Sequence, residues 1–167
     1  MNLVTCSLFE AYNNNRNFKS VKKMSRSNKY CVTPDQLIKA IMGEMEAKRF
    51  YEKLITMTTD EENKKIIRGI IKDEEFHQME FRKLYVALFR KQPAVPPLGP
   101  EREINSFFQG LGMALNDELG AYEFYRDIIM QCYDNRTVMS IFFKVFTDEN
   151  EHAMIENYMM NKENYNR

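Results

Sequence analysis

Two stretches of sequence decide the fold: Asp73-Glu74-Glu75-Phe76-His77 and Asp148-Glu149-Asn150-Glu151-His152. Each contains a Glu-x-x-His motif, and the two motifs together hold both histidines of the chain. Residues at positions i and i+3 of a helix project from the same side, so each motif would place a carboxylate and an imidazole on one helix face. Two such faces, joined by one glutamate from each of two further helices, form the ligand set of a carboxylate-bridged dinuclear metal site.

The rest of the chain supplies those further helices. Apolar periodicity predicts helices over about 34–57, 60–91, 102–132 and 136–160. Thr33-Pro34-Asp35-Gln36 reads as a capping box before the first, and Thr59-x-x-Glu62 as a second capping box before the next. In each helix the apolar stripe is interrupted near its middle by one carboxylate, and these are Glu44, Glu74, Glu118 and Glu149. The competing interpretation is that the stripes are misphased by one position and the glutamates are surface residues.

The two halves of the chain also repeat each other. Glu44 precedes Phe50-Tyr51 at the same spacing as Glu118 precedes Phe124-Tyr125. All four glutamates lie about 20 Å from the turn of their own hairpin, given a rise of about 1.5 Å per residue. The proline-rich segment over about 91–102 can span roughly 33 Å, the length of a bundle. The sequence therefore predicts an all-α four-helix bundle of two hairpins joined by a long crossover. Six side chains would meet at one height: Glu44, Glu74, His77, Glu118, Glu149 and His152.

Composition limits the alternatives. A chain of 167 residues suits one domain, and 24 basic against 24 acidic residues give no sign of a nucleic-acid partner. Cys6, Cys31 and Cys132 are odd in number and lack C-x-x-C spacing, which argues against a disulfide framework, a zinc ribbon or a rubredoxin-type iron site. Cys132 is expected to be a small buried hydrophobe. Without a secretory signal or a run of ~18–20 apolar residues, we expect a cytoplasmic protein with no membrane contact.

The ends of the chain differ from its middle. Residues 1–32 are basic, rich in Asn and Ser, and weakly periodic, which favours a disordered tail, although a docking peptide is an alternative. We expect the metal-binding domain over 33–161 and a short C-terminal tail over 162–167.

The charges of the four stripes favour a metal. Burying one unpaired carboxylate costs several kcal/mol, and two divalent ions would neutralise all four. Imidazole and carboxylate ligands together suit iron or manganese better than structural zinc. Tyr51 and Tyr125 flank the ligands and are either core residues or hydrogen-bond donors to a ligating carboxylate. The neighbouring acids off the stripes are predicted to be solvated: Glu46, Glu75, Glu80, Glu123 and Glu151.

These motifs resemble the di-iron domain of rubrerythrins, in the ferritin-like superfamily. The resemblance covers about 34–160 and rests on Glu44-x-x-Ala47-Lys48-x-x-Tyr51, Glu118 and the paired Glu-x-x-His motifs. It implies the ferritin-like bundle and the six ligands named above. Two departures matter: Ala121 stands where rubrerythrins carry an additional glutamate, and the rubredoxin domain with its two C-x-x-C pairs is absent.

The resemblance implies a di-iron oxidoreductase, with manganese as the alternative metal. We expect it to react with peroxide or O2 as a peroxidase or ferroxidase in oxidative stress, as a homodimer supplied with electrons by a separate donor protein. Iron storage or handling in a larger shell is the alternative, and a metal-free helical scaffold is a weaker one.

Overall fold

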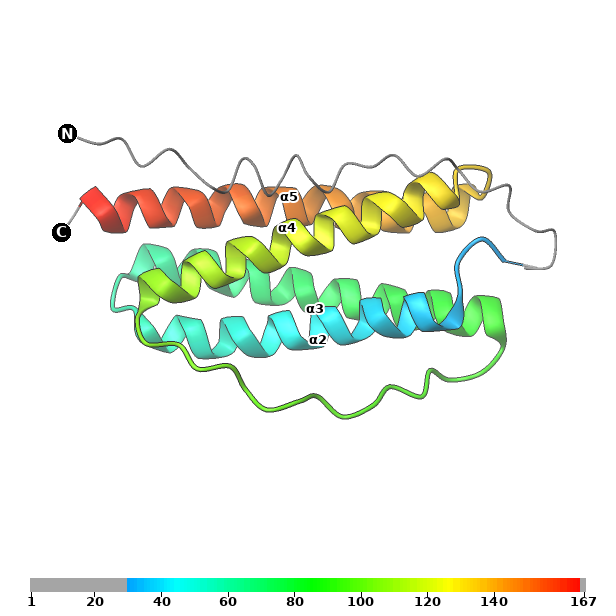
Figure 1. Cartoon of the computed structure of the whole chain (residues 1–167), viewed down its shortest axis with the longest axis horizontal. Coiled ribbons are helices and arrows are strands. Elements are labelled where there is room, and N and C mark those ends of the chain that lie inside the picture. The colour runs from blue at the N-terminus through cyan, green and yellow to red at the C-terminus, as the bar shows by residue number, and fades with distance from the viewer. Residues whose placement is uncertain (1–29, 166–167) are drawn as a thin grey trace, which may run out of the picture.

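The computed structural model describes residues 30–165, which form an all-α bundle of two helical hairpins (Figure 1). The first hairpin consists of α2 (Pro34–Leu54), a 3-10 turn η1 (Ile55–Met57) and α3 (Glu61–Phe89), and the second of α4 (Phe107–Gln131) and α5 (Arg136–Tyr165). Helices of one hairpin pack most closely on each other. The predicted architecture is therefore confirmed. Over residues 30–165, no helix combines the length and apolar character needed to cross a membrane.

Capping side chains fix where the helices begin. At α2 the expected capping box is present, since Thr33 Oγ1 accepts from the Gln36 amide at 3.1 Å and the Gln36 side chain accepts from the Thr33 amide at 2.8 Å. At α3 the prediction was wrong by one residue. Asp60, rather than Thr59, caps this helix, and its carboxylate accepts from the amides of Glu62 at 2.8 Å and Asn63 at 3.2 Å.

The second hairpin begins and ends later than predicted. Ser106 caps α4 by accepting from the Gln109 amide at 3.1 Å, so residues 102–106 belong to the crossover rather than to a helix. Helix α5 continues to Tyr165, so residues 162–165 extend the bundle and do not form the expected tail.

The crossover follows α2 along the outside of the bundle (Figure 1). It leaves α3 at Arg90, whose left-handed φ of 57° turns the chain away from the helix axis. Two side chains of α2 hold it, because Arg49 donates to the Gly99 carbonyl at 2.8 Å and Lys53 donates to the Arg102 carbonyl at 2.7 Å. The long crossover inferred from the prolines is therefore present.

A disulfide joins the start of the bundle to the end of α4, contrary to the prediction from cysteine spacing. Cys31 and Cys132 are bonded, with their Cα atoms 5.2 Å apart, although 101 residues separate them in the sequence. Val32 is buried beside them in the core. The folded part of the chain thus begins before the expected boundary at residue 33. The rest of the predicted tail, residues 1–29, lies outside the described residues.

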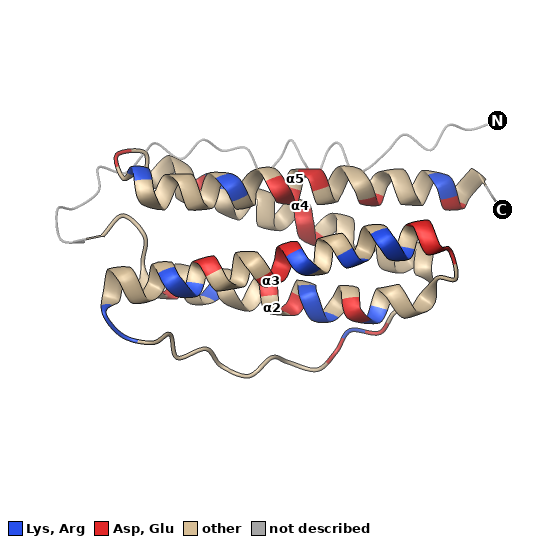
Figure 2. Ribbon diagram, turned by 180° about the vertical axis from the view of Figure 1, so that it is seen from behind, with Lys and Arg blue, Asp and Glu red and all other residues tan. Residues whose placement is uncertain are grey.

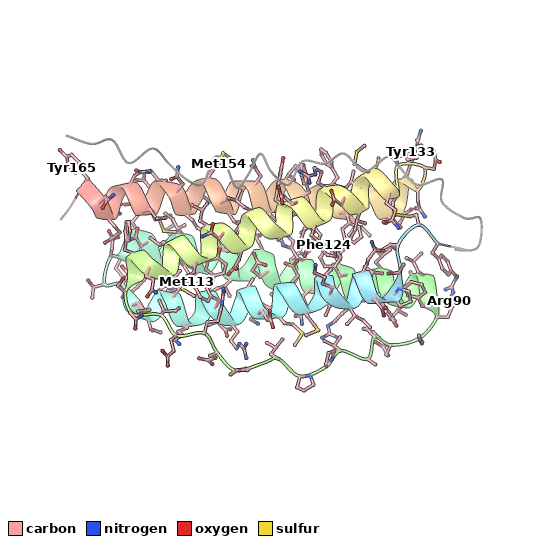
Figure 3. The ribbon with its side chains drawn as sticks, in the orientation of Figure 1. Arg90, Met113, Phe124, Tyr133, Met154 and Tyr165 are labelled. Atoms are coloured by element: carbon pink, nitrogen blue, oxygen red, sulfur yellow. A yellow bond between two sulfur atoms is a disulfide. The ribbon has the colours of Figure 1, made fainter. Side chains whose placement is uncertain are left out.

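Two apolar clusters fill the bundle on either side of a polar middle layer. The cluster nearer the disulfide includes Phe81, Tyr125 and Phe142. The cluster at the opposite end includes Leu54, Ile67, Ile70, Leu111 and Met159. Figure 3 shows the two ends, with Arg90 and Tyr133 at one and Tyr165 at the other. The polar layer is therefore enclosed along the bundle axis by close-packed side chains.

Candidate metal centre

All six predicted ligands lie in the polar middle layer. Acidic residues occur near the middle of each of the four helices, on segments that meet in the bundle (Figure 2). The six side chains are buried, none more than 3% exposed: Glu44, Glu74, His77, Glu118, Glu149 and His152. The alternative of misphased stripes with surface glutamates is therefore wrong for these positions. Of the neighbouring acids predicted to be solvated, Glu46, Glu75, Glu123 and Glu151 are exposed and Glu80 is half-buried.

The six side chains form two groups that share two members. One group contains Glu44, Glu74, His77 and Glu149, and the other contains Glu74, Glu118, Glu149 and His152. Within each group one ligand atom of every residue lies within 4.8 Å of the others. Glu74 and Glu149 belong to both groups, while each group has one glutamate and one histidine of its own.

An aspartate of the opposite hairpin lies beside the Nε2 atom of each histidine. His77 Nε2 lies 2.8 Å from Asp148 Oδ2, and His152 Nε2 lies 3.6 Å from Asp73 Oδ2. These aspartates immediately precede Glu149 and Glu74 in the repeated motifs. The opposite ring nitrogen of each histidine, Nδ1, faces the carboxylates of its group. A carboxylate behind a histidine fixes the ring orientation and tautomer that metal binding requires.

The two flanking tyrosines donate hydrogen bonds to the glutamates that are not shared. Tyr125 donates to Glu44, and Tyr51 lies within hydrogen-bond distance of both Glu118 and Glu156. Burial acts first to raise the pKa of each phenol, and the nearby carboxylates raise it further. Both phenols therefore keep their protons, and the interpretation of Tyr51 and Tyr125 as hydrogen-bond donors is favoured over a purely apolar role.

Without a cation, the pKa values of the two carboxyl groups common to both ligand groups are raised. Burial and the adjacent Glu44 raise the pKa of Glu149 to about 8, and burial followed by the charges of Glu44 and Glu149 raises that of Glu74. Burial lowers the pKa of His77, but its contacts with Glu149 and Glu44 outweigh this and bring the value to about 10. Protons thus compensate the repulsion that divalent cations would otherwise neutralise.

The polar atoms facing the middle of the site lack hydrogen-bond partners. They are Glu44 Oε2, Glu74 Oε1, His77 Nδ1, Glu149 Oε1 and His152 Nδ1. An unpaired buried polar atom costs about 1–3 kcal/mol. Three carboxylate oxygens and two imidazole nitrogens that converge without hydrogen bonds fit metal ions, because each offers a lone pair to a cation once its proton is displaced.

Glu156 is a buried acid that the sequence reading missed. It lies on α5, four residues after His152, and it is fully buried. Burial and the charge of Glu118 raise its pKa to about 9. The spacing of Glu149, His152, Glu156 and Met159 places all four on one helix face, so the periodicity of α5 could have identified it.

A cleft between α2 and α4 connects the site with the surface. It has a volume of about 470 Å³ and is lined at its base by Glu44, Glu74, Glu118 and Glu149. Small residues, including Ala47 and Ala121, line its walls. Phe124 flanks it on the side of α4 that faces α2 (Figure 3), and Lys39 lies over this ring.

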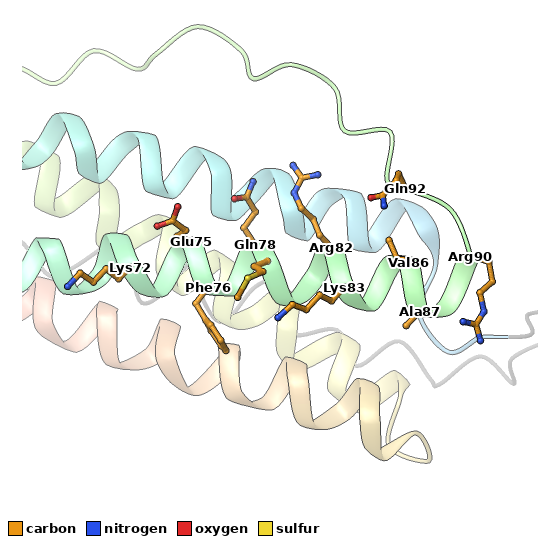
Figure 4. Close-up of a pocket in the computed structure, with 11 residues that line it drawn as sticks. Lys72, Glu75, Phe76, Gln78, Arg82, Lys83, Val86, Ala87, Arg90 and Gln92 are labelled. Carbon is orange, nitrogen blue, oxygen red and sulfur yellow. The ribbon is translucent and has the colours of Figure 1, made fainter.

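A larger hollow, about 1040 Å³, lies away from the site. It follows the outer face of α3 and is lined by residues that include Lys72, Arg82 and Arg90 (Figure 4). None of the six ligand candidates lines it, and it is open along its length. Of these two hollows, the smaller cleft between α2 and α4 is the one that reaches the ligand candidates.

Comparisons with known proteins agree with this geometry. The sequence model of the rubrerythrin family matches residues 4–85, which include the first Glu-x-x-His motif. An uncharacterized protein from Bacillus subtilis, YhjR, is 32% identical over 118 residues, covering 71% of this chain and 79% of the relative.

Solved structures share the fold. A ferritin-like diiron-carboxylate protein from Bacillus anthracis has a TM-score of 0.69 at 17% identity, over 82% of this chain and 99% of that one. A Rhodobacter capsulatus bacterioferritin, described with a metal-free dinuclear site and haem iron, has a TM-score of 0.67 at 20% identity, over 79% and 85%. A hypothetical protein from Pyrococcus furiosus has a TM-score of 0.67 at 22% identity, over 77% and 89%. The chain therefore belongs to the rubrerythrin-like proteins of the ferritin-like superfamily.

Proposed function

We propose that this protein binds two iron ions and uses them to reduce hydrogen peroxide or O2. The observation that carries the proposal is the pair of buried ligand groups that share Glu74 and Glu149. Two divalent ions would neutralise the four glutamates of these groups and give the unpaired oxygen and nitrogen atoms their partners. Manganese fits the same ligand types, and iron is favoured by the family to which the chain belongs.

The chain's own residues have defined tasks in this proposal. Glu74 and Glu149 would each contact both ions, Glu44 and His77 would hold one ion, and Glu118 and His152 the other. Each bound Fe(II) would give up one electron. The two ions together would therefore supply the two electrons that peroxide accepts. The apolar clusters above and below exclude bulk water, and the cleft between α2 and α4 admits the oxidant.

Two features distinguish the proposed reaction from that of rubrerythrins. Ala121 lines the cleft where the family carries its additional glutamate, so this chain has no carboxylate there to change its ligation with the oxidation state. The chain also lacks a C-x-x-C pair for a rubredoxin-type iron centre. We therefore propose that electrons come from a separate donor protein, and that the oxidised site is reduced from outside.

Anaerobic loading with Fe(II) tests the proposal. The loaded protein should consume one peroxide for each pair of irons and develop the absorption of oxidised dinuclear iron, and O2 should be tested in a parallel arm. Glu74→Gln should abolish the reaction, because it removes a ligand of both ions. Glu75→Gln is the matched control, since Glu75 is exposed and pairs only with Lys48 at 3.1 Å.

Two outcomes would count against the proposal: oxidation no faster than that of free Fe(II), or equal loss of activity in the two variants. Particle size by light scattering separates the two classes of function. A homodimer favours the oxidoreductase, and a large multi-subunit particle favours iron storage.

A further inference from the structure

Glu156 is the fifth buried glutamate among residues 30–165, and it belongs to neither ligand group. It is fully buried, and its Oε2 atom has no hydrogen-bond partner. Its Oε1 atom contacts the hydroxyl of Tyr51. A buried acid without a basic partner destabilises the fold, and a residue such as Met159, one turn later on the same face, would fill the space at less cost. The position of Glu156 therefore needs an explanation other than packing.

The hydroxyl of Tyr51 is shared by two carboxyl groups, those of Glu118 and Glu156. A phenol has one hydrogen to donate, so only one of the two groups can accept it, and the other must donate a hydrogen of its own to the phenol oxygen. Glu118 belongs to a ligand group, and carboxylates bind metal ions as anions. The consistent arrangement therefore runs from the carboxylic acid of Glu156 to Tyr51, and from Tyr51 to Glu118.

The internal repeat of the chain supplies a comparison. Four residues after His152 stands Glu156, while four residues after His77 stands Phe81. Phe81 packs against Tyr125, with ring centroids 5.3 Å apart, where Glu156 contacts Tyr51. Tyr125 donates to Glu44 and has no second carboxylate beside it among the described hydrogen bonds. The two halves of the site therefore have equivalent ligands but different residues next to their tyrosines: Glu156 contacts Tyr51, and Phe81 contacts Tyr125.

We propose that Glu156 is a positioning residue that acts through Tyr51 on Glu118 and makes the two metal positions unequal. Its acid group directs the hydroxyl of Tyr51 toward Glu118, which orients this carboxylate before a metal arrives. The position with Glu118 and His152 is thereby preorganised relative to the one with Glu44 and His77. This inference rests on the proposed dinuclear site and adds an order of occupation to it.

Titration with Co(II) under anaerobic conditions tests the inference, with absorption measuring affinity and anomalous diffraction measuring the occupancy of each position. The wild-type protein should bind two ions in two steps, with the position beside His152 filling first. Glu156→Met should weaken that position by roughly 10–100-fold, the range seen when a partner behind a ligand is removed, and leave the position beside His77 unchanged. Glu156→Gln should retain most of the affinity, because its amide can donate to the oxygen of Tyr51.

Tyr51→Phe provides the second arm and does not depend on the folding of the Met variant. It should weaken the same position selectively, and adding Glu156→Met to it should produce no further loss, because Glu156 acts through Tyr51. Equal weakening of both positions, additive losses in the double variant, or no change in any variant would overturn the inference and leave two-metal binding intact. Failure of the wild-type protein to bind Co(II) would instead overturn the proposed function, and the inference with it.

Discussion

At the scale of single residues, Asp148 links the two hairpins, because its carboxylate lies 2.8 Å from Nε2 of His77, whereas Asp73 lies 3.6 Å from Nε2 of His152. We predict that Asp148→Asn lowers metal affinity by about 10–100-fold, since the amide polarises the ring of His77 less strongly than the carboxylate does. Competition with a coloured chelator measures this affinity. Asp127→Asn is the control, because Asp127 is exposed on α4 and pairs only with its neighbour Arg126. Equal affinities in the two variants would contradict the assigned role.

The six ligand candidates could be predicted from sequence because a helical repeat places them on one face at one depth. Glu156 satisfies the same periodicity, but it lies outside the Glu-x-x-His motifs, so these motifs alone do not identify it. The aspartates of the repeat were visible in the sequence as well. Their role could not be derived there, because Asp148 contacts His77 across the two hairpins, and pairing of this kind depends on how the hairpins dock.

At the scale of helices, Gly110 of α4 packs tightly against Leu54 of the first hairpin. A Cβ atom at this position would clash with the fully buried side chain of Leu54 and lie 3.0 Å from Ile104. We predict that Gly110→Ala destabilises the protein by about 1–3 kcal/mol through overpacking. Gly69→Ala is the matched control. Nothing lies within 4 Å of its added methyl group, so it should stabilise α3 by about 1 kcal/mol. Urea denaturation measures both, and equal effects would contradict the packing described.

The disulfide joins elements that are far apart in the sequence. We predict that the double variant Cys31→Ser/Cys132→Ser loses about 2–4 kcal/mol of stability, because the bond closes a loop of about 100 residues and restricts the unfolded chain. Reducing agent should destabilise the wild-type protein by a similar amount and leave the double variant unchanged. Insensitivity of the wild-type protein to reduction would contradict a stabilising role for this bond.

The existence of the four helices could be predicted from the sequence, whereas their exact ends and the disulfide between Cys31 and Cys132 could not. Thr59 and Asp60 are adjacent residues of good capping type, and which one caps α3 depends on the backbone of the turn. Residues 102–106 lie outside α4, and Lys53 and the ion pair with Asp117 hold Arg102 at their start against the bundle. Cys31 and Cys132 carry no local signal of pairing, since their contact results from the docking of the two hairpins.

At the scale of the whole molecule, the buried acids and histidines couple stability to pH. The metal-free fold raises the pKa of Glu149 to about 8, of Glu156 to about 9 and of His77 to about 10, against ordinary values of 4.5 for the acids and 6.5 for histidine. A group whose pKa is higher in the folded than in the unfolded chain contributes its full stabilisation at low pH. That stabilisation is lost as the pH rises through the folded-state pKa. The contribution of these three groups to stability should therefore fall between about pH 4.5 and pH 10.

We predict that the Tm of the metal-free protein decreases over this range by roughly 3–5 °C per pH unit for each proton released. The metal-loaded protein should show a flat or rising Tm over the same range, because cations replace the protons in the site. Scanning calorimetry in matched buffers measures both curves. A metal-free Tm that rises from pH 6 to pH 9 would contradict the buried, protonated site.

The common height of the six ligands is the property of the whole molecule on which the function depends, and it could be derived from the lengths of the helices alone. The most direct test is anomalous diffraction at the iron edge from crystals of Fe(II)-loaded protein grown without oxygen. We predict two peaks per chain, one among Glu44, Glu74, His77 and Glu149 and one among Glu74, Glu118, Glu149 and His152. The absence of peaks in the bundle interior, or iron bound only at exposed acids, would contradict a dinuclear centre at the middle of this protein.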